Sequence, residues 1–261
     1  MSPVRPLRRL GAIVLACLLP FTAGHGQTPT VAAASDLQFA LQEVQTLFAR
    51  DRGHPIQLVF GSSGNFYRQI VEGAPFELFL SADESFVTRL AEQGLTRDEG
   101  QLYAIGRLAV FAPQGSPLAV DADLNGLRAA LQRGEIRRFA IASPEHAPYG
   151  ARAEEALRHA GLWDALQPAL VLGENVSQAA QFAASGNAQG GIIAYSLALA
   201  PNVAALGTYA LLPEHWHSPL RQRMVMLKNA SPAIAAFYDY LQQPAAQAIL
   251  RRHGFAVPAE D

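Results

Sequence analysis

The feature that most constrains the fold is the alternation of short apolar runs with amphipathic stretches along the chain. The first run, Thr30 to Ala34, precedes a stretch from Leu37 to Phe48 in which apolar residues recur at helical spacing. The pattern then repeats toward the C-terminus. The other strand-like runs are residues 56–60, 76–80, 108–112, 139–142, 169–172, 191–194 and 224–227. This alternation predicts an α/β fold with mainly parallel sheets that helices cover on both faces.

Two interruptions of the pattern indicate a division into two lobes. Pro113 ends one strand-like run, and the last amphipathic segments have no strands of their own. We therefore predict that residues 27–112 and 222–261 form lobe 1 and that residues 113–221 form lobe 2. The C-terminal helices are expected to pack back on lobe 1.

The first 26 residues have the features of a secretory signal peptide. Three arginines precede an apolar run from Leu10 to Phe21, and small residues follow it. The run is too short to span a bilayer, which takes about 20 apolar residues. We predict cleavage between Gly24 and Gly26, a periplasmic location and no membrane insertion of the mature chain.

Charge and cysteine content exclude several classes of protein. The whole chain has 20 Lys plus Arg against 22 Asp plus Glu; removal of the leader, with its three arginines, leaves 17 against 22, a net charge of -5. A chain without a basic excess is not expected to bind nucleic acid. The single cysteine, Cys17, lies in the leader, so the mature chain has no disulfide and no Cys-based zinc site.

Four strand-to-helix turns contain small or hydroxyl residues immediately before a helix. They are residues 34–36, 61–64, 146–150 and 174–177. Any one of them would more often be a simple helix cap. In an open α/β sheet, however, such turns meet at the carboxyl ends of the strands, where ligands bind. Four helix N-termini with hydroxyl donors would suit a small oxyanion.

Five stretches distributed over the mature chain carry a resemblance to a known family. They are VAAASDLQFAL, VFGSSGNFYRQIVEGAPFELFLSAD, ASPEHAPYG, GENVSQAAQFAASGNAQGG and AAFYDYLQQPAAQAILRRHGF. In these stretches the chain resembles the periplasmic molybdate-binding proteins of ATP-driven (ABC) uptake systems, which have the type II periplasmic binding protein fold. The resemblance implies two α/β lobes that close over one tetrahedral oxyanion.

The resemblance also implies which residues bind the ligand. The expected donors are the hydroxyls of Ser35 and Ser63, the backbone N–H groups of Ser63 and Val176, and a group from Ala147 or Tyr149. Ser35, Ser63 and Val176 would hold molybdenum as its oxyanion, through the oxygens of molybdate or tungstate. No cofactor is implied beyond this ligand. The implied partner is the membrane permease of an ABC importer, and the receptor is expected to be a monomer.

Two positions depart from the pattern of the family. Members differ in where a ligand tyrosine lies, and this chain has both Tyr149 and Tyr195; we favour Tyr149 for its PYG context. Asp36 stands where some members have a neutral side chain, and a carboxylate would repel an oxyanion. The favoured interpretation is that Asp36 turns away and caps the helix of residues 37–48. The alternative is that it accepts a proton from hydrogen phosphate or a phosphonate.

The predicted function is therefore that of a receptor and not of an enzyme. Within the same class, the ligand could instead be sulfate, phosphate or a phosphonate. The rival from another class is a secreted serine hydrolase that uses Ser62 or Ser63. The stretch from Gly61 to Asn65 only partly matches a nucleophile elbow, since its fifth residue is not glycine.

Overall fold

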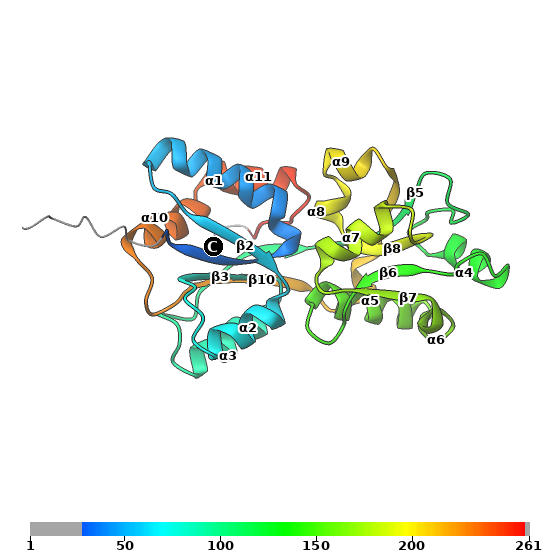
Figure 1. The fold of residues 1–261 in the computed structure, drawn as a ribbon, viewed down its shortest axis with the longest axis horizontal. Helices are drawn as coiled ribbons and strands as arrows, with labels where there is room; N and C mark the ends of the chain where they lie inside the picture. The colour runs from blue at the N-terminus through cyan, green and yellow to red at the C-terminus, as the bar shows by residue number, and fades with distance from the viewer. Residues whose placement is uncertain (1–27, 259–261) are drawn as a thin grey trace, which may run out of the picture.

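A computed structural model describes residues 28–258, and in it the chain forms two α/β lobes (Figure 1). Each lobe is built on one five-stranded sheet, with strand orders β2-β1-β3-β10-β4 and β7-β6-β8-β5-β9. Four strands of each sheet are parallel, and one strand, β10 or β5, is antiparallel to its neighbours. The predicted fold class is confirmed. The predicted signal peptide, with Cys17, lies outside the described residues.

Lobe 1 has a hydrophobic core on each face of its sheet, because successive residues of a strand point to opposite faces. Val31 and Ala33 pack into a core with α1, α10 and α11, whereas Ala32 faces the core of α2 and α3 on the other side (Figure 1). The strands are β1 (Thr30–Ala34), β2 (Gln57–Gly61), β3 (Leu78–Ser81), β4 (Gln101–Gly106) and β10 (Leu220–Met226). The helices are α1 (Gln38–Arg52), α2 (Ser63–Val71), α3 (Glu84–Glu92), α10 (Pro232–Leu241) and α11 (Pro244–Arg252). The C-terminal helices thus cover lobe 1, although the chain enters them from lobe 2 through β10.

Lobe 2 has a single continuous core around its sheet. Helix α7 lies on one face with α8 and α9, and α5 and α6 lie on the other (Figure 1). The strands are β5 (Leu108–Pro113), β6 (Phe139–Ala142), β7 (Leu170–Gly173), β8 (Gly190–Ala194) and β9 (Gly207–Leu211). The helices are α4 (Asn125–Gln132), α5 (Pro148–His159), α6 (Trp163–Leu166), α7 (Val176–Ala184), α8 (Tyr195–Ala198) and α9 (Pro201–Ala204). Short 3-10 turns cover Ser35–Leu37, Gln167–Ala169 and Glu214–Trp216.

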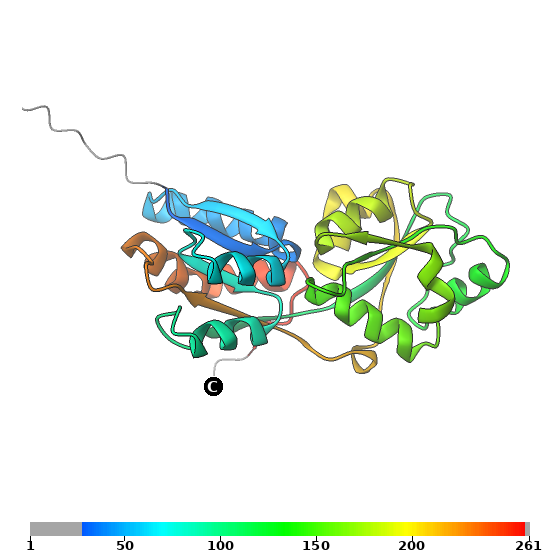
Figure 2. The ribbon, with the colours of Figure 1, turned by 60° about the horizontal axis from the view of Figure 1, so that its bottom comes forward.

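The chain crosses between the lobes twice, and the two crossing segments run beside each other (Figure 2). The first crossing is at Arg107, between β4 of the first sheet and β5 of the second. The predicted boundary at residue 112 is therefore wrong, because residues 108–112 pair with β8 and β9 of lobe 2. Pro113 ends β5 and does not mark the crossing. The return strand β10 begins at Leu220, two residues before the predicted start of the second part of lobe 1.

None of the helices formed by residues 28–258 combines the length and the apolar character that crossing a bilayer requires.

Candidate functional site

A small pocket lies where the carboxyl ends of strands from both sheets meet. Its lining residues are Ala34, Ser35, Asp36, Gly61, Ser62, Ser63, Ala82, Ala147, Pro148, Tyr149 and Val176. The empty space between these residues is about 180 Å³, part of it open to solvent. The pocket therefore suits a compact ligand of a few atoms, and no lysine or arginine lines it.

Three helices begin at this pocket, and their first N–H groups are free. Ser63, Pro148 and Val176 are the first residues of α2, α5 and α7. Among the residues that the structure describes, the N–H groups of Ser63, Tyr149 and Val176 have no hydrogen-bond acceptor. Pro148 has no N–H, so Tyr149 provides the first one of α5. These donors and the positive ends of three helix dipoles favour an anion.

Two buried serine hydroxyls add donors to the same pocket. The Ser35 Oγ accepts a hydrogen bond from the Ser177 N–H at 3.2 Å, and the Ser63 Oγ accepts one from the Ala82 N–H at 2.9 Å. Neither hydroxyl donates to an acceptor within residues 28–258. Because each oxygen already accepts from the backbone, each hydroxyl hydrogen is available to a ligand.

The structure distinguishes between the two candidate donors at the start of α5. The Ala147 N–H donates to the Ser143 carbonyl at 3.0 Å, so it is already engaged. The Tyr149 N–H is free, and both residues line the pocket. Of the two, Tyr149 is therefore the residue with a free backbone N–H at the pocket.

Asp36 lines the pocket and connects the lobes. Its side chain is 1% exposed, and its Oδ2 accepts from the Tyr149 hydroxyl at 2.9 Å and from Gln222 Nε2 at 2.5 Å. The Tyr103 hydroxyl donates to the side-chain oxygen of Gln222, Oε1, at 2.7 Å. Asp36 Oδ1 has no partner among the described residues. Burial raises the pKa of Asp36 from 3.8 to about 6, and the hydrogen bonds from Gln222 and Tyr149 oppose this rise.

These contacts change two predictions about polar groups at the site. The interpretation of Asp36 as a helix cap is wrong, because no side chain caps the 3-10 turn Ser35–Leu37 or helix α1. The Tyr149 hydroxyl donates its only hydrogen to Asp36, so it has none left for a ligand. Burial and the charge of Asp36 also raise the pKa of Tyr149 well above 10, so the phenol stays neutral.

Tyr195, the other candidate ligand tyrosine, is placed elsewhere. It is the first residue of α8, and its ring packs at 62° against Tyr209 with centroids 5.9 Å apart. The Arg107 guanidinium also lies over this ring, 5.4 Å from the centroid of Tyr195. Tyr195 does not line the pocket, so this placement gives its hydroxyl no role there.

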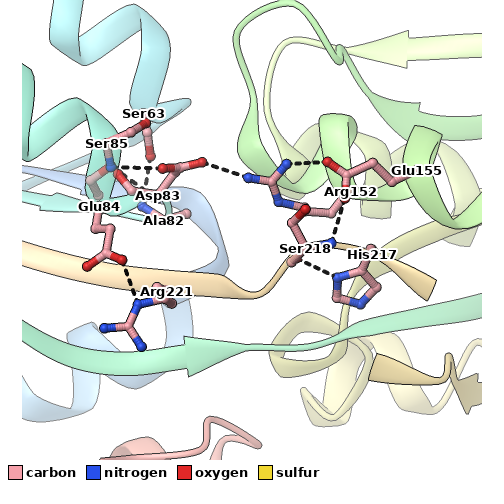
Figure 3. A network of polar contacts seen from close by, with 11 residues as sticks. Ser63, Ala82, Asp83, Glu84, Ser85, Arg152, Glu155, His217, Ser218 and Arg221 are labelled. Carbon is pink, nitrogen blue, oxygen red and sulfur yellow. Dashed lines mark hydrogen bonds and ion pairs between the residues drawn. The ribbon is translucent and has the colours of Figure 1, made fainter. Parts of the chain in front are cut away.

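The two lobes touch directly beside the pocket. The Gly64 N–H donates to the His146 carbonyl across the cleft at 3.0 Å. A Cβ on Gly64 would lie 2.5 Å from that carbonyl oxygen, so the close approach requires glycine. Farther out, Arg152 of α5 pairs with Asp83 before α3 at 2.9 Å (Figure 3). The lobes are thus closed over the pocket.

The serines do not have the contacts of a hydrolase nucleophile. The Ser62 Oγ accepts from the Asn65 N–H at 3.3 Å and caps α2. His146, whose carbonyl accepts from the Gly64 N–H, directs its Nε2 to the Glu174 carbonyl at 3.0 Å. Within residues 28–258, no histidine is hydrogen-bonded to Ser62 or Ser63. No group of three or more metal-ligating side chains occurs in this part of the chain either.

Sequence reasoning missed the contacts of three residues that lie around the pocket without lining it. Gln222, on the return strand, is fully buried and was visible only as a polar residue in an otherwise strand-like segment. Gly64 was noted as a turn residue, but its contact with the other lobe has no local signal. Arg152 lies one turn after Tyr149 in α5, and the sequence around it does not distinguish it from an exposed residue of a helix.

Comparisons with known proteins agree with this geometry. The model of the family described as bacterial extracellular solute-binding protein matches residues 29–256. The molybdate-binding protein ModA of Rhodobacter capsulatus is 36% identical over 94% of this chain and 93% of its own, and that of Azotobacter vinelandii is 34% identical over 95% of each. The structure of the periplasmic molybdate-binding protein of Azotobacter vinelandii superposes with a TM-score of 0.80 at 31% identity, covering 88% of this chain and all of the other.

The match of the family model over nearly the whole described chain, together with relatives above 30% identity, establishes the family. The chain belongs to the bacterial extracellular solute-binding proteins.

Proposed function

We propose that this protein is an extracytoplasmic receptor that captures molybdate, or tungstate, between its lobes and delivers it to the permease of an ABC importer. The observation that carries the proposal is the set of unpaired donors around one small pocket: three backbone N–H groups and two serine hydroxyls. The relatives named as molybdate-binding proteins, at 34–36% identity over almost the whole chain, support the choice of anion.

Neutral donors suit a receptor that must also release its ligand. A buried lysine or arginine would lose its hydration and would bind the anion too strongly for ready transfer. Hydroxyls and helix N-termini stabilise negative charge without a full opposite charge. The net charge of the chain, -2, therefore does not prevent anion capture, because the binding is local.

A second ligand class is favoured by one specific observation. Asp36 lines the pocket and has a carboxylate oxygen, Oδ1, without a hydrogen-bond partner among the described residues. Such an oxygen can accept a proton from hydrogen phosphate or a phosphonate, whereas molybdate has no proton to offer. The second candidate is therefore a receptor for a protonated oxyanion.

The remaining features of the proposal follow from a receptor role. The protein acts in the periplasm after removal of residues 1–26, as a monomer, and without a cofactor or catalytic activity of its own. It binds neither nucleic acid nor the bilayer directly. The relatives, which are named as binding proteins and not as enzymes, support the receptor role.

Calorimetry with molybdate, tungstate, sulfate and phosphate tests the proposal. We expect molybdate and tungstate to bind much more tightly than sulfate or phosphate. Ser35→Ala and Ser63→Ala should each weaken molybdate binding about ten- to a hundredfold, since each removes a hydrogen bond to a charged group. Tighter binding of phosphate, lost in Asp36→Asn, would support the second candidate. Absence of heat with every oxyanion, together with Ser63-dependent ester hydrolysis, would contradict both.

A further inference from the structure

Arg152 forms an ion pair across the cleft without lining the pocket. Its Nη2 lies 2.9 Å from Asp83 Oδ2, and the two side chains are 17% and 22% exposed (Figure 3). Arg152 belongs to α5 of lobe 2, and Asp83 precedes α3 of lobe 1. Among the ion pairs formed by residues 28–258, this one alone connects a helix of one lobe to the other lobe.

Asp83 is held in place whether or not Arg152 is near. Its Oδ1 accepts from the Ser85 N–H at 2.9 Å and caps α3, which leaves Oδ2 for Arg152. The preceding residue, Ala82, donates its N–H to the pocket hydroxyl of Ser63 at 2.9 Å. The carboxylate is therefore fixed to the same turn that positions a ligand-binding serine.

Arg152 is also held by a contact that does not depend on closure. Its Nη1 pairs with Glu155 one turn further along α5, at 2.5 Å. The second oxygen of Glu155 accepts from the Ser218 N–H at 2.6 Å, in the segment that leads into the return strand (Figure 3). Within the network of Asp83, Arg152, Glu155 and Ser218, the Arg152–Asp83 contact is the one that joins opposite lobes, so it is the part of this network that must break when the lobes separate.

We propose that the Arg152–Asp83 ion pair is an interlobe latch: it stabilises the closed receptor and so slows release of the bound anion, which it does not touch. The inference rests on the proposed function, since it assigns positioning residues to that same cleft. An interaction present only in the closed state lowers the dissociation rate, because it must break before the anion leaves. It has little effect on the first encounter of the anion with the open cleft.

The substitution Asp83→Asn tests the latch with little effect on the fold. Asparagine keeps an oxygen that can cap α3 but removes the charge that attracts Arg152. The matched control is Glu154→Gln, which removes the ion pair between Glu154 and Arg158 on the same helix and within one lobe. Each protein is loaded with radiolabelled molybdate and chased with excess unlabelled molybdate, and the rates of release and capture are measured by rapid filtration.

We expect Asp83→Asn to release molybdate about three- to tenfold faster, a size appropriate to a partly exposed ion pair. The capture rate should change by less than about twofold. High salt should accelerate release from the unaltered protein and not from Asp83→Asn, because salt screens the latch. Glu154→Gln should behave as the unaltered protein does. Equal release rates for Asp83→Asn and the unaltered protein, or equal acceleration by both variants, would overturn the latch.

Small-angle X-ray scattering without ligand separates failure of the latch from failure of the proposed function. If the unaltered protein does not retain molybdate, the proposed ligand is wrong. The radius of gyration from scattering then tests by itself whether the Arg152–Asp83 ion pair stabilises the closed lobes. At low salt, Asp83→Asn should have a larger radius of gyration than the unaltered protein and Glu154→Gln. Equal radii for all three proteins would overturn the latch.

Discussion

The carboxyl group of Asp36 allows a quantitative test of the electrostatics of the pocket. Burial raises its pKa from 3.8 to about 6 in the folded protein. Because the folded value is the higher one, the ionised carboxylate destabilises the fold. This destabilisation is absent below about pH 4, where the group is protonated in both states, and is complete above about pH 6. Its full size is about 3 kcal/mol.

We expect Asp36→Asn to raise the free energy of unfolding by up to about 3 kcal/mol near pH 7 and to change it little near pH 4. Asparagine retains an oxygen that can accept from Tyr149 and Gln222 at the position of Oδ2. Denaturant titrations of the ligand-free protein at the two pH values measure the difference. Effects of all other titrating groups cancel, since they are common to both proteins.

A control substitution separates this effect from a general loss of negative charge. Asp123 is exposed in the loop before α4, and Asp123→Asn removes the same charge there. Its effect should be small and similar at both pH values. A loss of stability in Asp36→Asn near pH 7, or a gain of equal size at both pH values, would refute the reasoning.

Three further predictions concern the closed cleft. Gly64→Ala should weaken molybdate binding at least roughly tenfold in calorimetry. The alanine Cβ would lie 2.5 Å from the His146 carbonyl oxygen and hold the lobes apart. Unchanged affinity would show that closure does not need this contact. Tyr195→Phe should change the molybdate affinity by less than about twofold. A large loss of affinity would show that the Tyr195 hydroxyl contacts the ligand. Molybdate affinity should fall as the pH rises from about 5 to about 8, since the ionised Asp36 repels the dianion, and Asp36→Asn should abolish this dependence; a pH-dependence that persists in the variant would assign it to another group.

The fold class was predictable because the spacing of apolar residues that distinguishes strands from helices is visible within short stretches of the sequence. Buried parallel strands are continuous apolar runs, such as the one from Thr30 to Ala34. Two strands were missed: β4, in which only three of six residues are buried, and β9, in which none is; each lies at an edge of its sheet. Their mixed composition gives a weaker signal than a central strand does.

The lobe boundary could not be placed from local pattern. Residues 101–113 form two consecutive strands separated by Arg107 alone, and they belong to different sheets. Which sheet a strand joins depends on pairing with β8 and β9, about 80 residues or more further along the chain. Pro113 was therefore a misleading marker, since it only ends β5.

The site was predictable where function depends on local chemistry and not where it depends on distant contacts. The turns that contain Ser35, Ser63 and Val176 reach one pocket, as their hydroxyls and helix starts indicated. The role of Asp36 was not predictable, because its partners Tyr149 and Gln222 are 113 and 186 residues away. A cap is the usual local role of such a residue, and the tertiary contacts override it.

The most direct test of the central claim is a crystal structure of the protein grown with molybdate, with X-ray data collected at the molybdenum absorption edge. We predict one strong anomalous peak in the pocket, with its oxygens hydrogen-bonded to the Ser35 and Ser63 hydroxyls and to the Ser63, Tyr149 and Val176 N–H groups. An empty pocket at saturating molybdate, or a peak bound elsewhere, would contradict the account.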